Sequence, residues 1–492
     1  MSQMQQYDLA VLGAGPAGHF GAIQAAKAGL KVAVVEEQSR LGGNSTNTGT
    51  IPSKSLREAT LHLTGIRQRT FYGQYYRVKD IESLRDLHVS ANQVVGRNTG
   101  VYEDQLRRNG VCLCKGHASF VGERQIVVER PGGVEVFEAK KVLIATGSRP
   151  VRPPGLDFDG VHVVDSNQIL SLETIPSRLI IVGAGVIGIE YACIFSALGS
   201  SVTVIHDRET FLDFADQEVV EILKYKMRTQ KVDFRVNEKV EELGRCGDFV
   251  YARTASNKEI VGDCVLFCGG RQGNTDLINV EATGLEPDKR GRLTVDENLE
   301  TNVPGVYAAG DVIGFPALAA TSREQGRRAV CHAFNLAPPT EGPLLPYGIY
   351  GIPEISMIGP TEKELTEKGI SYDVGRARYC EIARGQILGD VDGLLKILFD
   401  PDTLKILAIH IIGEGATEMV HIGQAVHAFG GDLHYLAEAV FNYPTLAECY
   451  KVAALDGINR ASLRDRCLTC KVDLEADAAS EDTVDESELE TA

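Results

Sequence analysis

Three features are missing from this sequence, and each absence excludes a class of protein. No apolar run reaches transmembrane length, and the first residues lack the basic-then-apolar pattern of a secretory leader. Positive charge is not in excess, because the formal net charge is -17. This balance argues against nucleic acid or an anionic membrane as the main partner. We therefore expect a cytoplasmic protein with almost nothing to cleave before a first strand at Tyr7.

Cysteine spacing of a known kind is also missing. The chain has 11 cysteines, an odd number, without the spacing of a metal site or of a disulfide framework. We expect reduced thiols and no metal. At 492 residues the chain is long enough for two to four domains with ample cores.

What the sequence does contain is a glycine pattern between two apolar runs. The apolar run 7–12 is followed by a pattern typical of a helix over 17–28 and by a second strand that ends at Glu36. Between run and helix stand three glycines, Gly13, Gly15 and Gly18. The first makes a tight turn, the second lets backbone approach a pyrophosphate, and the third lets helix pack on strand. Glu36 can bond ribose hydroxyls, so this βαβ unit predicts a dinucleotide site.

A second unit of the same kind follows. A strand at 179–182, a helix to Leu198 and a strand at 201–205 surround Gly183, Gly185 and Gly188. His206 stands where an acid would read the ribose, and Asp207 and Arg208 come next. An acid favours NAD, whereas Arg accommodates the 2′-phosphate of NADP, so neither cofactor is excluded. His206 and Arg208 could equally be ordinary surface residues at the end of a strand.

The loop 42–54, which reads G-G-N-S-T-N-T-G-T-I-P-S-K, is the third motif. Ser53 is placed to cap a helix expected over 54–59. The loop resembles that of the flavoprotein disulfide reductases, such as dihydrolipoamide dehydrogenase, glutathione reductase and mercuric reductase. Their loop reads G-G-x-C-x-x-x-x-C-x-P-S-K, and its cysteines form a disulfide that takes electrons from flavin. Here Ser45 and Thr50 stand at those positions, and a hydroxyl cannot form a disulfide.

The resemblance implies an α/β fold of two Rossmann-like domains, for FAD and NAD(P), and a C-terminal α+β dimerisation domain. It places the FAD domain at 1–155 and 275–345, the NAD(P) domain at 156–274 and the interface domain at 346–462. The remainder, 463–492, carries nine acidic residues against one lysine from Lys471 onward, and we expect an acidic, disordered tail.

The resemblance also implies FAD contacts. The run 37–45 would lie along FAD from ribose towards flavin, although 37–40 could be a plain surface loop. Backbone near Ala118 would touch adenine, Asp311 would bond a ribityl hydroxyl, and a helix over 317–334 would point at the flavin. The residues so implied are Glu37, Gln38, Ser39, Arg40, Leu41, Gly42, Gly43, Asn44, Ser45, Thr50, Ala118, Thr146, Gly147, Gly270, Asp311 and Ala319.

Two positions carry the catalytic prediction. By resemblance Lys54 lies near flavin N5 and pairs with Glu190, so that its charge favours the reduced flavin; a buried structural ion pair is the alternative. The closing motif of disulfide reductases is H-P-T-x-x-E, whose histidine is a general acid and base. Tyr443 takes that place here, and a Tyr cannot do this work at neutral pH.

Loss of both cysteines and of the histidine leaves the nicotinamide pocket as the only exit for the electrons. We expect hydride transfer from NADPH through FAD to NAD, in ping-pong order. From Tyr7 to Arg460 the chain is similar to the soluble, Si-specific pyridine nucleotide transhydrogenases, although Ser45 replaces the one cysteine that they usually keep. A homodimer or larger homo-oligomer is implied. The alternatives are an NAD(P)H diaphorase or oxidase, and a non-catalytic flavin-binding interaction protein. Cys467 and Cys470 could add a dithiol reaching a partner's flavin.

Overall fold

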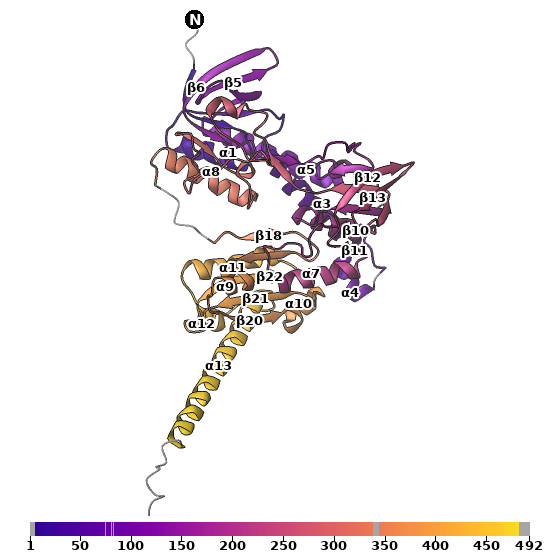
Figure 1. Cartoon of the computed structure of the whole chain (residues 1–492), viewed down its shortest axis with the longest axis vertical. Coiled ribbons are helices and arrows are strands. Elements are labelled where there is room, and N and C mark those ends of the chain that lie inside the picture. The colour runs from indigo at the N-terminus through magenta and orange to yellow at the C-terminus, as the bar shows by residue number, and fades with distance from the viewer. Residues whose placement is uncertain (1–4, 74, 80, 82, 338–343, 482–492) are drawn as a thin grey trace, which may run out of the picture. The chain divides into compact units, whose positions relative to one another are not determined.

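The chain forms two compact units, and each is described by itself (Figure 1). The computed structural model describes residues 5–73, 75–79, 81, 83–337 and 344–481, with side chains through residue 464. Unit 1 consists of Met1–Leu212, Tyr225–Pro343 and Tyr350–Ile352, and unit 2 of Asp213–Lys224, Leu344–Ile349 and Pro353–Ala492.

Unit 1 begins with a sheet in the order β3-β2-β1-β6-β5-β4, and β17 also pairs with β6. Its strands are β1 (Gln5–Leu12), β2 (Val32–Glu36), β3 (Cys112–Lys115), β4 (His117–Phe120), β5 (Gln125–Arg130), β6 (Gly133–Ile144) and β17 (Val306–Ala308). β1 runs parallel to β2 and β6, whereas β4 and β5 are antiparallel neighbours. β6 is one continuous strand of 12 residues, because no turn residue interrupts it.

A second, parallel sheet has the order β11-β10-β9-β15-β8. Its strands are β8 (Val163–Asp165), β9 (Arg178–Val182), β10 (Ser201–Ile205), β11 (Val232–Arg235) and β15 (Cys264–Phe267). Two small antiparallel sheets complete the unit's strands: β12 (Val240–Cys246), β13 (Phe249–Thr254) and β14 (Glu259–Gly262), and β7 (Ser148–Pro150) with β16 (Arg271–Gly273). Both predicted βαβ units are therefore present.

The helices of unit 1 cover these sheets. They are α1 (Pro16–Lys27), α2 (Gly43–Asn47), α3 (Thr50–Thr64), η1 (Ile66–Gln68), α4 (Arg69–Tyr72), α5 (Arg85–Arg108), η2 (Gln168–Ser171), α6 (Val186–Leu198), η3 (Val280–Thr283), η4 (Asp311–Ile313) and α8 (Ala319–Ala333). The predicted cap at Ser53 is wrong. α3 already begins at Thr50, and the Ser53 hydroxyl donates to the Thr50 carbonyl at 3.3 Å.

Unit 2 is built on an antiparallel sheet in the order β18-β19-β22-β21-β20, which matches the predicted α+β pattern. Its strands are β18 (Tyr347–Ile349), β19 (Ile355–Ile358), β20 (Asp373–Arg378), β21 (Leu394–Phe399) and β22 (Ile406–Ile412). Its helical segments are α9 (Glu362–Glu367), η5 (Tyr379–Glu381), α10 (Ala383–Leu388), α11 (Ala416–Ala428), α12 (Leu433–Glu438) and α13 (Glu448–Glu481). Helix α7 (Gln217–Thr229) starts in unit 2 and ends in unit 1.

A buried lysine holds the start of α7 within unit 2. The Lys396 side chain is 1% exposed, and its ammonium lies 2.9 Å from Asp216 Oδ1 and 3.0 Å from Glu218 Oε2. It also contacts a carboxylate oxygen of Glu362. Burial alone would lower the pKa of Lys396, but these carboxylates outweigh it and raise that pKa. The predicted domain 156–274 therefore contributes Asp213–Lys224 to the second unit.

The C-terminal segment differs from its prediction. The residues from Leu463 were expected to be disordered, but α13 continues through them to Glu481, as the yellow helix of Figure 1 shows. The helix is anchored in the core of unit 2 by Cys449, Tyr450, Ala453 and Ala461, and strong helix formers such as Leu and Ala follow. Residues 482–492 lie outside the described part.

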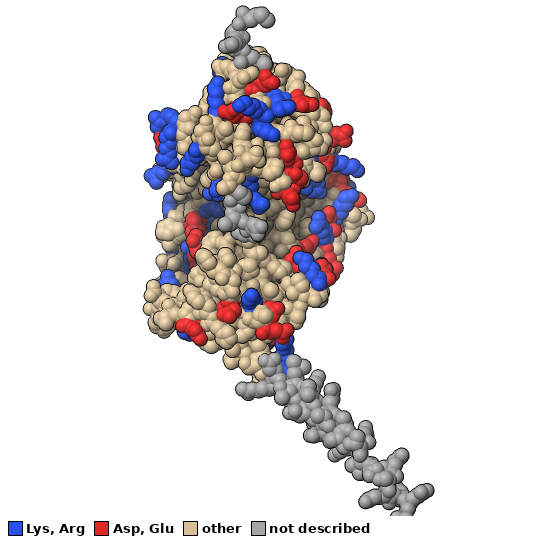
Figure 2. Space-filling model, turned by 90° about the vertical axis from the view of Figure 1, so that its left-hand side faces the viewer, with Lys and Arg blue, Asp and Glu red and all other residues tan. Residues whose placement is uncertain are grey.

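Charge on the surface is mixed. Figure 2 shows acidic and basic side chains interspersed over the face it presents. Among the helices of the described residues, none combines the length and the apolar character needed to cross a membrane.

Candidate functional site

The first glycine unit has the geometry of a dinucleotide cradle. Gly13 has φ +102°, and a Cβ there or at Gly18 would collide with backbone carbonyls. Gly15 is not constrained in this way, since its Cβ would come no closer than 3.7 Å to Gly43 Cα. Gly15 also precedes α1, whose N-terminus has no side-chain cap. Two glycine backbones thus leave space beside an uncapped helix N-terminus, which suits a pyrophosphate.

Glu36 lies at the end of β2 and is 7% exposed. Its carboxylate accepts the N–H groups of Ala14 and Gln38, both at 2.8 Å. Burial raises the pKa of Glu36 above its usual value, and the two N–H groups oppose that shift. A fixed, buried carboxylate at this position is able to accept further bonds from ribose hydroxyls.

Thr146 and Gly147 follow the carboxyl end of β6, which lies beside the carboxyl end of β1. Asn274 fixes both: its side chain donates to the Thr146 carbonyl at 2.9 Å, and its backbone N–H donates to the Gly147 carbonyl at 3.1 Å. The Thr146 hydroxyl is buried and has no hydrogen-bond partner among the described residues. A buried polar atom without a partner is costly, so this hydroxyl supports a ligand at the edge.

A polar network surrounds Asp311, which begins η4. The Ser148 hydroxyl donates to Asp311 Oδ2 at 2.7 Å, and Arg271 Nε donates to the same hydroxyl at 2.8 Å. Arg271 and Asn44 also donate to the Ser148 carbonyl. Burial lowers the pKa of Arg271, while the nearby Asp311 and Asp165 act against that shift. The network fixes the Asp311 carboxylate that was predicted to meet the ribityl chain.

The residues after Glu36 form a loop tied to the β3–β4 turn. Lys115 donates to the carbonyls of Gln38 and Ser39, each at 3.1 Å, and Glu37 Oε2 lies 3.4 Å from His117 Nδ1. The Gly116 N–H donates to the Glu36 carbonyl at 3.0 Å. Ala118 of β4 follows two residues after Gly116, so it lies near Glu36.

The remaining predicted FAD residues lie in α2, in α8 and in the loops before α2 and β16. Leu41 is fully buried in the core, Gly42 precedes α2 with φ +98°, and Ser45 lies within α2. Gly270 has φ +133°, and its carbonyl accepts the Val151 N–H at 3.1 Å. Ala319 is the first residue of α8, whose N-terminus has no side-chain cap. α8 packs closely on α1. A Cβ at Gly326 would collide with the Ala17 carbonyl, so the contact requires a glycine there.

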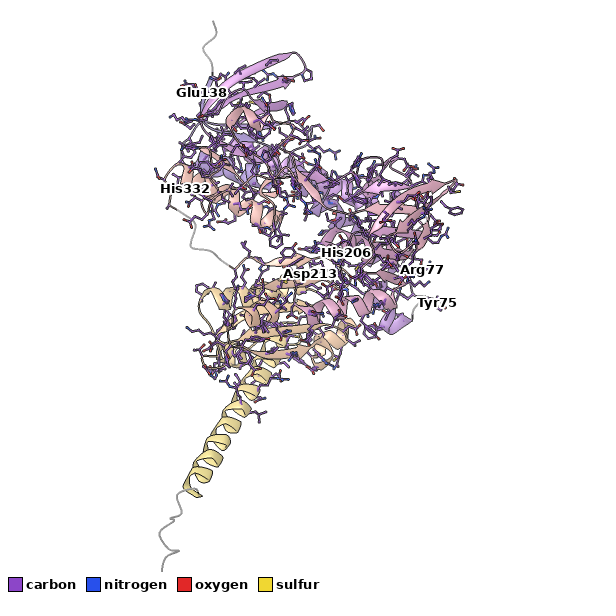
Figure 3. The ribbon with its side chains drawn as sticks, viewed as in Figure 1. Tyr75, Arg77, Glu138, His206, Asp213 and His332 are labelled. Carbon is purple, nitrogen blue, oxygen red and sulfur yellow. The ribbon has the colours of Figure 1, made fainter. Side chains whose placement is uncertain are left out.

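The second glycine unit repeats the cradle. Gly183 has φ +107°, a Cβ on Gly188 would collide with the Gly183 carbonyl, and a Cβ on Gly185 would meet nothing within 4 Å. Here too the helix, α6, begins without a side-chain cap. His206 follows directly after β10, as its label in Figure 3 shows. The Ala184 N–H donates to His206 Nδ1 at 3.4 Å, and Asp207 Oδ1 lies 3.5 Å from that nitrogen.

Lys54 and Glu190 form the predicted pair. Lys54 Nζ on α3 lies 2.6 Å from Glu190 Oε2 on α6. The other carboxylate oxygen accepts the Tyr350 N–H at 2.9 Å, and Lys54 Nζ lies 5.0 Å from the centre of the Tyr350 ring. Arg57 secures the same segment by donating to the Gly351 carbonyl at 2.9 Å. Glu190 is largely buried, whereas the Lys54 side chain remains 25% exposed and accessible to a ligand.

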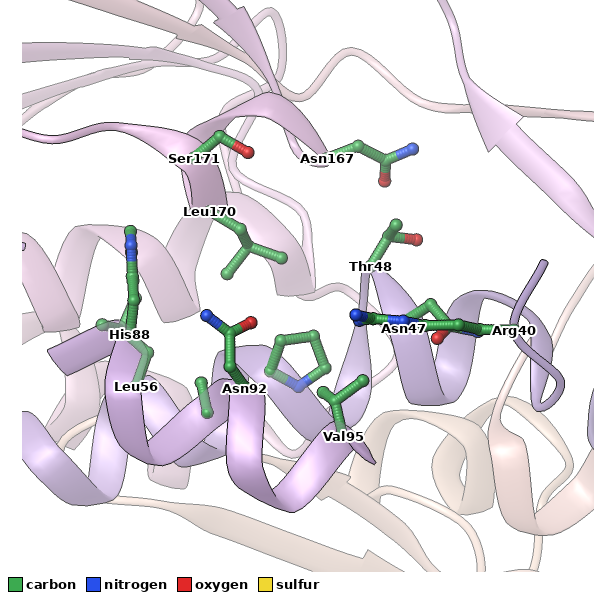
Figure 4. Close-up of a pocket in the computed structure, with 12 residues that line it drawn as sticks. Arg40, Asn47, Thr48, Leu56, His88, Asn92, Val95, Asn167, Leu170 and Ser171 are labelled. Carbon is green, nitrogen blue, oxygen red and sulfur yellow. The ribbon is translucent and has the colours of Figure 1, made fainter. Parts of the chain in front are cut away.

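A cavity of about 310 Å³ lies against the loop 42–54, between α3, α5 and η2. Its polar lining residues include Arg40, Asn47, Thr48, His88, Asn92 and Asn167. Figure 4 shows His88 and Arg40 entering from opposite sides. Asn47 Oδ1 and His88 Nε2 are buried and have no partner among the described residues. The cavity can therefore offer hydrogen bonds to a small ligand or to water beside the loop.

The positions that carry thiol chemistry in the resembled family carry none here. Ser45 lies in α2 and Thr50 begins α3, and the loop between them has no cysteine. The cysteines with described side chains are all free. Tyr443 is exposed on unit 2. Cys467 and Cys470 lie outside the residues with described side chains.

Comparison with known proteins identifies the family. The sequence model of the pyridine nucleotide-disulphide oxidoreductases matches residues 7–326, and the model of their dimerisation domain matches residues 345–454. The chain belongs to the pyridine nucleotide-disulphide oxidoreductase family. This membership confirms the predicted fold class and supports FAD and NAD(P) as cofactor and substrates.

Several relatives of this oxidoreductase are close over almost their whole length. It is 51% identical to a protein of Mycobacterium tuberculosis and 43% identical to one of Pseudomonas putida, both named soluble pyridine nucleotide transhydrogenase. The alignments cover 93% and 92% of this chain and 98% of each relative. Among solved structures, the HOCl-induced flavoprotein disulfide reductase RclA of Escherichia coli superposes with TM-score 0.80 at 26% identity, covering 91% of this chain and 99% of that one. LpdA of M. tuberculosis, at 24% identity and TM-score 0.83, shows the shared fold over 92% of this chain and 99% of its own.

Some site residues of this oxidoreductase were not predicted from its sequence. Tyr350 and Arg57 support the Lys54–Glu190 pair, and Ser148 with Arg271 supports Asp311. Tyr350 lies 160 residues from Glu190 in the sequence, so no local pattern relates them. Ser148 and Arg271 lie on β7 and β16, which pair with each other although they are far apart in the sequence.

Proposed function

We propose that this chain catalyses reversible hydride transfer between NADPH and NAD. The observation that carries the proposal is a complete pair of dinucleotide cradles beside a loop that has Ser45 and Thr50 in place of a cysteine pair. Bound FAD supplies the ability to accept a hydride from one nicotinamide and to give it to another. The names of the close relatives support the same reaction.

The residues of the chain bind and orient the two dinucleotides. Gly15, Gly43 and the N-terminus of α1 would hold the FAD pyrophosphate, while Glu36 and Asp311 would hold its ribose and ribityl hydroxyls. Gly185 and the N-terminus of α6 would hold the nicotinamide dinucleotide in the same way. Because this second cradle must serve donor and acceptor in turn, the kinetics are ping-pong.

Lys54 and Glu190 are the proposed catalytic pair. The ammonium of Lys54 would supply a fixed positive charge that favours negative charge on bound FAD. Glu190 holds that ammonium at 2.6 Å and is itself held by the Tyr350 N–H, so the charge is positioned before the substrate arrives. Ser45 and Tyr443 take no part in the transfer.

The proposal includes a homodimer in the cytoplasm. Unit 2 matches the family's dimerisation domain and exposes large apolar side chains, among them Phe429, Val440 and Tyr443. A second copy of the chain would cover such a surface. The free cysteines support a reducing compartment.

Anaerobic rapid mixing tests the reaction directly. NADPH should bleach the flavin absorbance of the holoenzyme, and NAD should then restore it without oxygen, fast enough to account for steady-state turnover. Recovery only with oxygen or a quinone would instead show a diaphorase or oxidase. Failure of both NADPH and NADH to bleach the band would leave a non-catalytic flavin-binding protein.

Arg208 is expected to select NADPH. It is exposed directly after β10 and supplies the guanidinium that suits a 2′-phosphate. Arg208→Ala should weaken NADPH binding by about tenfold or more and change NADH binding by less than about twofold, as for other lost charge-assisted bonds. Titration of flavin bleaching with each nucleotide measures both, and Arg228→Ala on α7 is the matched loss of an exposed charge. Equal losses for both nucleotides would remove Arg208 from this role.

A further inference from the structure

Two thiols lie side by side at the edge of the first sheet. Cys112 and Cys114 belong to β3, the edge strand, and residues two apart on a strand share a face. Their sulfur atoms are 3.9 Å apart. Cys112 is exposed, whereas Cys114 is 5% exposed and packs in the core. The sequence prediction of scattered cysteines missed this pair, because C-x-C is a ligand spacing only when both residues lie on one face.

A third polar group closes one side of the pair. The Tyr7 hydroxyl on β1 lies 3.4 Å from Cys112 Sγ and donates to Gln5 Oε1 at 2.7 Å. β2 runs between β1 and β3, and the residue in register with Cys112 is Ala33, whose small side chain leaves room for the tyrosine to reach across. Cys114 is therefore buried in the core, and Cys112 lies beside the Tyr7 hydroxyl.

The separation of the sulfurs decides which chemistry fits. A tetrahedral Zn²⁺ centre with metal–sulfur bonds of about 2.3 Å keeps two sulfur ligands about 3.8 Å apart, close to the observed 3.9 Å. A thiophilic centre with somewhat longer bonds or narrower angles needs only small shifts of the two side chains. A disulfide needs about 2.05 Å, and these sulfurs would have to approach by nearly half their distance. The geometry thus favours one atom that bridges both sulfurs over a bond between them.

We propose that Cys112 and Cys114 form a binding site for a thiophilic metal or metalloid centre, such as Cd²⁺ or a trivalent arsenical, bound through both sulfurs. With phenylarsine oxide the arsenic–oxygen bond breaks and two arsenic–sulfur bonds form. The two thiol protons leave with the oxygen as water, and no electron is transferred. With Cd²⁺ each sulfur exchanges its proton for the metal.

The two cysteines have different parts in this reaction. Cys114 is 5% exposed, so a reagent in solution has little direct access to it. Exposed Cys112 is the entry point. Once a centre is attached there, Cys114 meets it at high effective concentration, which favours the bridged product over attachment at a single thiol.

Phenylarsine oxide provides the test on the full-length holoenzyme. Because the tail has its own C-x-x-C, every protein carries Cys467→Ser and Cys470→Ser as background. That background protein should take up one phenylarsenic group by intact mass, lose two thiols in a native thiol count, and release the group to a dithiol but not to a monothiol. Cys246→Ser, which removes another exposed cysteine, should behave in the same way.

Cys112→Ser and Cys114→Ser should each abolish the monothiol-resistant adduct and lower Cd²⁺ affinity at least tenfold, read from the ultraviolet Cd–thiolate absorbance. If either variant kept the resistant adduct, or if the background protein released it to a monothiol, the proposal would be overturned. Should Cys114→Ser fail to fold because its site lies in the core, Cys112→Ser at the exposed end decides the matter alone.

Discussion

A Lys54→Met variant should bleach its flavin with NADPH about 10²–10³-fold more slowly than the parent, the usual cost of one charge-stabilising group. Methionine keeps the length of the side chain and removes the charge. FAD content should not change, because the cradle residues Gly15, Glu36 and Asp311 lie on other elements. Glu190→Gln should slow the same step, since the ammonium then loses the carboxylate 2.6 Å away.

Rapid anaerobic mixing with NADPH measures the effect, with FAD content determined on the same samples. Lys54→Arg keeps a positive charge and should recover part of the rate. His62→Gln replaces an exposed side chain near the other end of the same helix and should match the parent. The double variant Lys54→Met/Glu190→Gln should be no slower than the worse single variant, because the pair acts as one device. A Lys54→Met rate within twofold of the parent would reject the catalytic assignment.

The second large effect is on stability. Lys396→Met should lower the free energy of unfolding of unit 2 by about 3–5 kcal/mol, the range for breaking a buried ion cluster by removing one partner. The ammonium is 1% exposed and contacts three carboxylates, so its loss leaves Asp216, Glu218 and Glu362 without their shared cation. The pairing raises the pKa of Lys396. Its contribution is therefore complete at neutral pH and is lost only as alkaline pH passes through that raised value.

Thermal and urea unfolding followed by circular dichroism provide the measurement. Lys405→Met removes an exposed lysine just before β22 and should leave the transition unchanged. The combined variant Asp216→Asn/Lys396→Met should be more stable than Lys396→Met alone, because one uncompensated charge is gone. Equal midpoints for Lys396→Met and Lys405→Met would show that the cluster contributes nothing.

Strands and cradles were predictable because their signals are local. The predicted bounds of β10 agree with the structure residue for residue, since it is a short run rich in β-branched residues. The glycines of both cradles followed from spacing alone. Their backbone geometry explains why: Gly13 and Gly183 need positive φ, and Gly18 and Gly188 need the missing Cβ.

The wrong predictions and the contacts that were not predicted depend on structure beyond the local sequence pattern. Ser53 has the chemistry of a helix cap, yet the preceding turn at Thr50 is already helical. Helix α13 continues past 463 because its beginning is anchored in the core of unit 2. The opposition of Gly43 to Gly15, the Tyr350 N–H on Glu190 and the Lys396 cluster all join segments that no periodicity relates. Such pairings arise from tertiary packing and carry no local signature.

The exchange of a carboxylate for an imidazole between the two cradles has a consequence for turnover. Ala14 donates to Glu36 at 2.8 Å in the first cradle, and Ala184 donates to His206 at 3.4 Å in the second. A carboxylate in place of His206 would repel the 2′-phosphate of NADP, and an imidazole does not carry that fixed negative charge. The first cradle therefore suits a cofactor that stays bound, whereas the second must release each nicotinamide dinucleotide before the next one binds.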